Sequence, residues 1–178
     1  GFGNKDDTFK SITTSGSGNA FWSLSANTAT FLVGTSGNVG PCAAIDVVGH
    51  EYGHGIADES GGLLYSGEAC ALHESFADIS GHTTEYYRDS ATANWYIGED
   101  VWKATKGIRN MEDPHLFKNP KAYGGQYFPQ GCHGSGGVQN RWFFLMVQGD
   151  TGINEFNYNF SLKGMGHDHA LQITYRNM

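Results

Sequence analysis

The sequence predicts an α+β fold, with a short β-rich region at residues 1–40 and a mainly helical part at residues 43–178. Two short runs of alternating polarity, AFWSL and TATFLV, favour a β-hairpin or two edge strands. Apolar residues then recur at helical spacing. A chain of 178 residues can fill one core but not two, so we treat residues 1–178 as one domain.

Four helices are expected along the second part. The apolar spacing between residues 43 and 58 predicts the first helix, although each of its glycines costs about 1 kcal/mol relative to alanine. A packed partner or a bound metal must therefore support it. Further helices are expected at about residues 67–87, over GGVQNRWFFLMVQG, and from about residue 167 to the C-terminus. Residues 88–132, rich in glycine, proline, asparagine and aspartate, are predicted to be irregular.

Composition excludes several classes of partner. The net charge is −7 and lysine and arginine are scattered, so no basic surface for nucleic acid or anionic lipid is expected. The longest apolar run, WFFLMV, is far too short to span a membrane. The glycine- and serine-rich runs are typical of extracellular enzymes, and the opening GFGNKDD predicts a processed chain or a fragment. We expect a secreted monomer.

Three cysteines are too few for a disulfide scaffold. Cys42, Cys70 and Cys132 are compatible with one bridge and one thiol, or with three buried thiols. Their spacing does not settle the pairing.

The segment HEYGH carries the first chemical signal. His50 and His54 lie four residues apart, so on a helix both imidazoles project from one face and can hold one metal ion. Glu51 lies beside them and can act on a water molecule at that ion. The alternative is a pair of surface histidines.

A third ligand is expected on the next helix. Glu74 lies in ALHESFADISGH, and a tight turn could return this helix antiparallel to the first. Zinc in hydrolytic sites takes three protein ligands and leaves one position open. Asp78, one turn later, could accept the free ring N–H of a ligand histidine. The alternative is that both acids face solvent.

Several blocks together resemble one family. IDVVGHEYGHGIAD, GGLLYSGE, HESFADISG, WYIGEDVW, IRNMEDP and GVQNRWFFL, with NAFW upstream, are similar to the thermolysin family of zinc metallopeptidases and cover most of residues 19–178. The resemblance implies a zincin-like fold and a secreted zinc endopeptidase. The chain is shorter than a complete family catalytic unit and is expected to lack much of the N-terminal sheet and the last helices.

The resemblance assigns roles to the residues of the reaction. His50, His54 and Glu74 would bind zinc, with Asp78 supporting one of the histidines. Glu51 would be the general base and proton shuttle. Tyr65 and His133 match the family's two donors to the oxyanion; the alternatives are a packed aromatic and a loop histidine.

Substrate contacts are implied in the same way. Asn19 and Ala20 match the edge strand on which a peptide lies, and Arg109 matches an arginine that binds a substrate carbonyl. The alternatives are plain strand structure and an ordinary salt bridge from Arg109 to Asp113 or Glu112. A pocket for a large apolar residue after the scissile bond would be lined by aliphatic side chains that are otherwise ordinary core, namely Val47, Val101 and Ile108.

Two positions depart from the family pattern. QYFPQGCH contains no carboxylate to orient His133, where the family usually has an aspartate. His73 stands where the family usually has an asparagine that supports a zinc histidine. The imidazole of His73 could replace that hydrogen bond or compete as a ligand.

Calcium is a further expectation from the resemblance. Asp46, Glu85 and Glu99 match carboxylates that bind structural calcium, an ion that takes six to eight oxygen ligands. Asn94 and Tyr96 stand where more carboxylates would be expected, which favours a single site over a double one. The alternative is a set of solvated acids.

Two functions remain after these observations. The first is a zinc endopeptidase acting on peptides or proteins. The second is a non-catalytic peptide-binding module stabilised by zinc and calcium, or an inactive fragment. The presence of Glu51, Tyr65, His133 and Arg109 favours the enzyme, because a binding module needs no base beside its metal.

Overall fold

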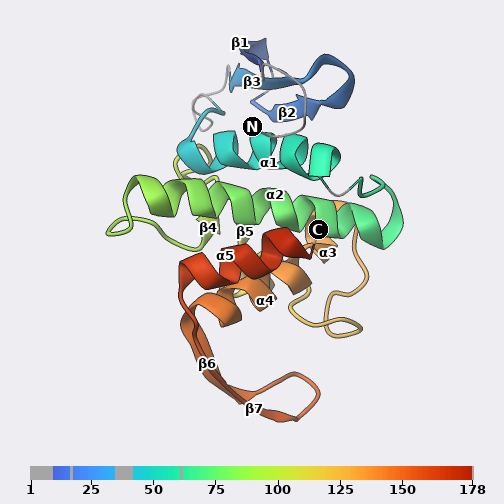
Figure 1. Ribbon diagram of the computed structural model, residues 1–178, viewed down its shortest axis with the longest axis vertical. Helices are drawn as coiled ribbons and strands as arrows, with labels where there is room; N and C mark the ends of the chain where they lie inside the picture. The colour runs from blue at the N-terminus through green and yellow to red at the C-terminus, as the bar shows by residue number, and fades with distance from the viewer. Residues whose placement is uncertain (1–9, 17, 35–41, 61, 178) are drawn as a thin grey trace.

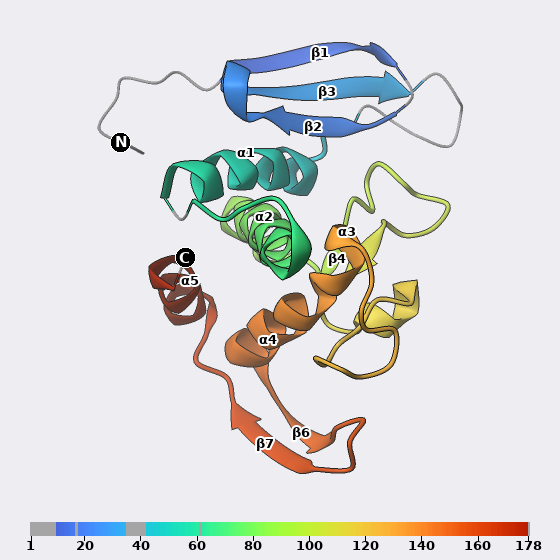
Figure 2. The ribbon, with the colours of Figure 1, turned by 90° about the vertical axis from the view of Figure 1, so that its right-hand side faces the viewer.

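The computed structural model describes residues 10–16, 18–34, 42–60 and 62–177. The elements form successive layers, with a small sheet above helix α1, helix α2 below α1, and helices α4 and α5 on the far side of α2 (Figures 1 and 2). The α+β fold class is confirmed. The rest of the predicted β-rich region, residues 1–9, 17 and 35–40, lies outside the described residues.

The sheet contains the predicted hairpin and one further strand. Strands β2 (Ala20–Ser23) and β3 (Thr28–Gly34) are antiparallel and are joined by a 3-10 helix, Leu24–Ala26. The turn ends at Asn27, which adopts the left-handed conformation with φ 47°. Strand β1 (Lys10–Gly16) pairs in parallel with β3, giving the order β1-β3-β2. We did not predict β1, because its serine, threonine and glycine residues are typical of a loop.

Helices α1 (Ile45–Ser60) and α2 (Gly67–Arg88) begin and end within about two residues of the predictions. They run antiparallel, since Gly49 approaches Gly81 and Gly53 approaches Ala77. A Cβ atom on Gly53 would lie 2.8 Å from the Cα of Ala77. The glycines that weaken α1 in isolation therefore allow α2 to approach closely, which is the support that the sequence required.

The C-terminal part contains the short helix α3 (Cys132–Ser135), then α4 (Gly137–Gln148) and α5 (His167–Arg176), as predicted for the last two. Strands β6 (Gly149–Ile153) and β7 (Asn159–Lys163) form a hairpin that the sequence analysis missed. Most of its side chains are exposed, so no apolar alternation marks it.

Residues 88–132 are largely irregular, as expected. They contain the two-residue strands β4 (Tyr96–Ile97) and β5 (Arg109–Asn110) and a 3-10 helix at Pro114–Phe117. A disulfide joins Cys70 of α2 to Cys132 of α3, and Cys42 is buried.

Two hydrophobic clusters flank the helix pair. One lies between the sheet and α1 and is formed by Ala29, Phe31, Cys42, Val47 and Val101. The other lies between α2, α4 and α5 and is formed by Ile79, Ile97, Met111, Phe143, Val147 and Ala170. Because each helix packs on a different cluster, their mutual contact is held from both sides. Within the described residues, every helix is too short or too polar to cross a bilayer.

Candidate active site

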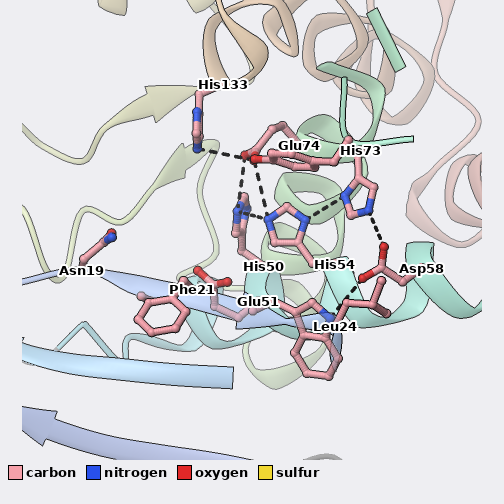
Figure 3. Close-up of a pocket in the computed structure, with 13 residues that line it drawn as sticks. Asn19, Phe21, Leu24, His50, Glu51, His54, Asp58, His73, Glu74 and His133 are labelled. Carbon is pink, nitrogen blue, oxygen red and sulfur yellow. Dashed lines mark hydrogen bonds and ion pairs between the residues drawn. The ribbon is translucent and has the colours of Figure 1, made fainter. Parts of the chain in front are cut away.

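Three predicted ligands meet between α1 and α2. His50 and His54 project from one face of α1, and Glu74 reaches them from α2 (Figure 3). The carboxylate oxygens of Glu74 lie 3.6 Å from His50 Nε2 and 3.7 Å from His54 Nε2. Within the described part of the chain, this is the one group of three or more His, Cys, Asp or Glu residues whose ligand atoms lie within 4.8 Å of one another.

The other partners of the two histidines fix which nitrogen faces the cluster. His50 Nδ1 lies 2.8 Å from Asp78 Oδ1, and His54 Nδ1 lies 2.8 Å from His73 Nδ1. With a hydrogen on each Nδ1, the two Nε2 lone pairs face one another at 3.1 Å. Two lone pairs this close to each other and to a carboxylate repel one another, and a cation bound between them would remove this repulsion.

The residues of this cluster fit zinc. Two imidazole nitrogens and one carboxylate are a usual ligand set in hydrolytic zinc sites. Among the described residues, nothing donates a hydrogen bond to the buried Oε2 atom of Glu74. Burial and the neighbouring His50 lower the pKa of His54 to about 2, so this ring is neutral, which is the form that binds a metal.

Asp78 anchors His50 through a buried network. Its Oδ1 accepts from Arg109 Nη2 at 2.6 Å, and its Oδ2 accepts from Arg109 Nε at 2.7 Å and Asn140 Nδ2 at 2.8 Å. Burial alone would raise the pKa of Asp78, but the Arg109 guanidinium and the His50 hydrogen bond lower it well below its ordinary value. Asp78 is therefore a fixed carboxylate that orients the His50 ring.

Asn140 was missed by the sequence analysis. It is 1% exposed on α4, bonds Asp78, and accepts a 2.6 Å hydrogen bond from Ser75 Oγ. An asparagine inside the apolar run GVQNRWFFL was the available signal, because a buried amide needs polar partners.

Arg109 is buried and its partner is Asp78. Arg109 therefore does form a salt bridge, as in the alternative interpretation, but with Asp78 rather than with Asp113 or Glu112. Two of its donor nitrogens are committed to Asp78. Its contact with a substrate carbonyl stays a prediction.

Tyr65 and His133 approach the same carboxylate from outside the helix pair. The Tyr65 hydroxyl donates to Glu74 Oε1, and His133 Nε2 lies 3.4 Å from that oxygen. Tyr65 is 56% exposed and the His133 side chain is 68% exposed. Neither is a packed core residue, and Figure 3 shows His133 pointing toward Glu74. The structure thus brings both predicted donors to the ligand cluster.

Glu51 lies beside the ligands and is 5% exposed. Burial raises the pKa of Glu51 to about 7, and the nearby Glu74 carboxylate acts in the same direction. A carboxyl group with this pKa can exchange a proton near neutral pH.

A cavity of about 400 Å³ joins these groups to the sheet. Asn19 and Ala20 line it together with Phe21, and β2 lies at one edge of the three described strands. Phe21 is 46% exposed and Leu24, also in the lining, is 58% exposed. An extended peptide could therefore lie along β2 with its backbone facing the ligand cluster.

The three aliphatic residues predicted to line a specificity pocket lie elsewhere. Val47 and Val101 belong to the cluster beneath the sheet, and Ile108 packs on the other cluster. The described lining of the cavity includes none of the three. Helical spacing placed Val47 on a buried face, but that face packs against the sheet.

The residues predicted for calcium lie around a separate cavity of about 230 Å³. Glu85, Asn94 and Glu99 line it, and Glu99 Oε1 accepts from Asn94 Nδ2 at 2.5 Å. Asp46 lies close by and accepts from the backbone N–H of Gly98. Within the described residues, Glu85 and Glu99 each keep one buried carboxylate oxygen without a hydrogen bond. Burial and then Glu99 raise the pKa of Glu85 to about 7.

The fold and the ligand cluster together define the zincin-like metallopeptidase class. The thermolysin metallopeptidase alpha-helical domain matches residues 61–178, and the thermolysin metallopeptidase catalytic domain matches residues 1–58. Because the first match alone spans about two thirds of the chain, the chain belongs to the thermolysin metallopeptidase family.

Similar proteins support the same family. The chain is 34% identical to "Thermolysin" of Alicyclobacillus acidocaldarius subsp. acidocaldarius over 90% of this chain and 30% of that protein. It is 34% identical to "Thermostable neutral protease NprT" of Geobacillus stearothermophilus over 90% of this chain and 29% of that protein. It is also 34% identical to "Bacillolysin" of Bacillus cereus, over 74% of this chain and 24% of that protein. The chain spans less than a third of the length of these relatives.

Proposed function

We propose that this chain carries the catalytic centre of a secreted zinc endopeptidase. The observation that carries the proposal is the placement of Glu51, with its pKa raised to about 7, next to the converging His50, His54 and Glu74. A module that only bound peptides would have no use for a buried base at this point.

Each side chain has a defined task in this proposal. When bound, zinc would polarise the peptide carbonyl and make the attacking water more acidic. Glu51 accepts a proton from that water and returns it to the leaving amine. Tyr65 and His133 donate hydrogen bonds to the oxygen that gains negative charge, and Arg109 holds a substrate carbonyl.

The peptide substrate would lie along β2, an edge strand among the described strands of the sheet. Asn19 and Ala20 would supply backbone hydrogen bonds. A preference for a large apolar residue after the scissile bond is part of the proposal, with the exposed Phe21 and Leu24 in the cavity as its support. Burial of such a side chain contributes about 1.5 to 3 kcal/mol.

Calcium is proposed as a structural ion at Asp46, Glu85, Asn94 and Glu99. The support is the pair of buried carboxylate oxygens without hydrogen bonds among the described residues, since hard oxygen ligands suit Ca2+. A secreted, monomeric state belongs to the same proposal.

A non-catalytic zinc-binding module is the second candidate. The observations that favour it are the His133 side chain, which is 68% exposed, and Arg109, two of whose donor nitrogens bond Asp78. The two candidates make the same prediction for metal content and opposite predictions for peptide cleavage.

The test combines metal analysis with a peptidase assay on Glu51→Gln. Glutamine keeps the shape of the side chain but cannot take a proton, so we expect zinc to be retained and peptide cleavage to fall by about 10²- to 10⁴-fold. Glu59→Gln, at an exposed position of the same helix, is the matched control and should change neither quantity. Equal cleavage by Glu51→Gln and the parent would refute the role of Glu51, and an inactive parent that holds zinc would favour the binding module.

A further inference from the structure

A line of hydrogen bonds leads away from the ligand cluster on the side opposite His133 (Figure 3). His54 Nδ1 lies 2.8 Å from His73 Nδ1, and His73 Nε2 lies 3.0 Å from Asp58 Oδ1. Trp22 Nε1 donates to the other oxygen of Asp58 at 3.1 Å. The line therefore connects a metal ligand on α1, through α2, with strand β2 at the cavity.

The direction of each hydrogen bond in this line follows from the bond between Trp22 and Asp58 at its far end. Indole N–H can only donate, so Asp58 accepts from Trp22 with one oxygen. As a carboxylate, Asp58 also accepts from His73, which places the His73 hydrogen on Nε2. With its one ring hydrogen on Nε2, His73 presents a bare Nδ1 that accepts from His54. His54 must carry its hydrogen on Nδ1, which leaves its Nε2 lone pair for a metal.

We propose that His73 is a positioning residue whose ring, held by Asp58, fixes His54 in the tautomer that can bind the metal. The proposal rests on zinc binding at the proposed site and does not require peptide cleavage. It also decides between the two alternatives for position 73. Both ring nitrogens of His73 are engaged by His54 and Asp58, so His73 supports a ligand and does not compete as one.

His73 is buried, so its hydrogen bonds are shielded from water. His73 is 2% exposed and its ring also packs against those of His54 and Tyr65, with centroids 4.9 and 5.4 Å apart. Water has little access to replace a lost hydrogen bond at this depth. Partners of this kind orient metal-binding histidines, and their loss commonly weakens metal affinity 10- to 100-fold.

The test measures zinc affinity by competition with a chelator. His73→Phe keeps a ring of similar size without nitrogens, and we expect zinc affinity to fall roughly 10- to 100-fold. His73→Asn places an amide oxygen near the position of Nδ1, so it can still accept from His54 and should restore affinity to within about threefold of the parent. Nitrogen NMR of the zinc-loaded parent should show hydrogens on His54 Nδ1 and His73 Nε2.

Asp58→Asn tests the same line without changing the packing of His73. Asparagine has one oxygen and one NH2 group in place of the two carboxylate oxygens, so it loses the hydrogen bond from either Trp22 or His73. We expect zinc affinity to fall about 3- to 10-fold. Glu59→Gln is the control for charge on the same helix turn. Asp58→Asn keeps the proposal testable if His73→Phe does not fold.

The outcomes separate the two proposals. Parent-like affinity in both His73→Phe and Asp58→Asn, or a hydrogen on His73 Nδ1 in the zinc-loaded parent, would overturn the positioning role. A parent that binds zinc but cleaves no peptide would refute the proposed enzyme and leave the positioning role standing. A parent that binds no zinc would refute both.

Discussion

Replacing Gly53 with alanine tests the contact between α1 and α2 on which the metal cluster depends. The new Cβ atom would lie 2.8 Å from Ala77 Cα and 2.8 Å from Ser80 Cβ, whereas ordinary contact begins at 3.4 Å. Ala77 Cα is backbone and cannot rotate away. The helices would have to separate locally by about 0.6 Å, the difference between the two distances.

Two opposing effects set the size of the change. Alanine stabilises a helix by about 1 kcal/mol relative to glycine. Overpacking a tight contact costs about 1 to 3 kcal/mol. We therefore expect the free energy of unfolding to fall by up to about 2 kcal/mol. Because His50 and His54 lie on α1 and Glu74 lies on α2, the same separation should weaken zinc binding.

Urea denaturation of the metal-free protein and a zinc titration measure the two effects. Gly131→Ala is the matched control, because its φ is −61° and none of the described residues lies within 4 Å of the added Cβ atom. The control should leave both quantities close to those of the parent. If Gly53→Ala is more stable than the parent and binds zinc equally well, the close approach of the two helices is not what aligns the ligands.

Three further predictions concern other parts of the fold. Burial, with His167 adding to it, lowers the pKa of His82 to about 4 from 6.5, so the unfolded chain binds more protons between these values. The contribution of His82 to the free energy of unfolding should therefore fall by up to about 3 kcal/mol as the pH drops from 6.5 to 4 in urea denaturation, and His82→Phe should reduce the slope by that amount, whereas an unchanged slope would contradict the assignment. The pKa of Glu85 is raised to about 7, so protons compete with calcium below that pH. Thermal stabilisation by calcium should grow as the pH rises through 7, and its persistence in Glu85→Gln would exclude this residue as a ligand. The disulfide closes a loop over a separation of 62 residues, so replacing Cys70 and Cys132 with serine should lower the free energy of unfolding by about 4 kcal/mol, and a loss below about 1 kcal/mol would show that packing alone holds α3.

The sequence predicted those parts of the fold in which spacing and chemistry act locally. Helices α1 and α2 begin and end near their predicted residues because apolar periodicity and ligand spacing agree there. The hairpin β6–β7 lies largely in solvent, so no buried face leaves a pattern in the sequence. Strand β1 is composed of residues that are common in loops.

The site residues also fall into two groups, those that local spacing predicts and those that depend on how distant segments pack. The spacing of His50 and His54 fixes their common face in any helix, so it was readable from the chain alone. The position of Asn140 on Asp78 and the pairing of Cys70 with Cys132 depend on how distant segments pack. The resemblance implied that Val47 lines a substrate pocket, but in the structure Val47 packs in the cluster beneath the sheet, because a matched position does not show which segment covers it.

The connection between α1 and α2 divides the ligand set between two lengths of chain. His50 and His54 precede this connection and Glu74 follows it, and the two family matches also meet there, at residues 58 and 61. A bound ion would thus join two segments of the chain instead of lying within one of them. A chain cut by protease within residues 62–66 should stay assembled while zinc is present and separate more readily after chelation. The connection is therefore a place where this protein could be split into two fragments whose reassembly is controlled by metal.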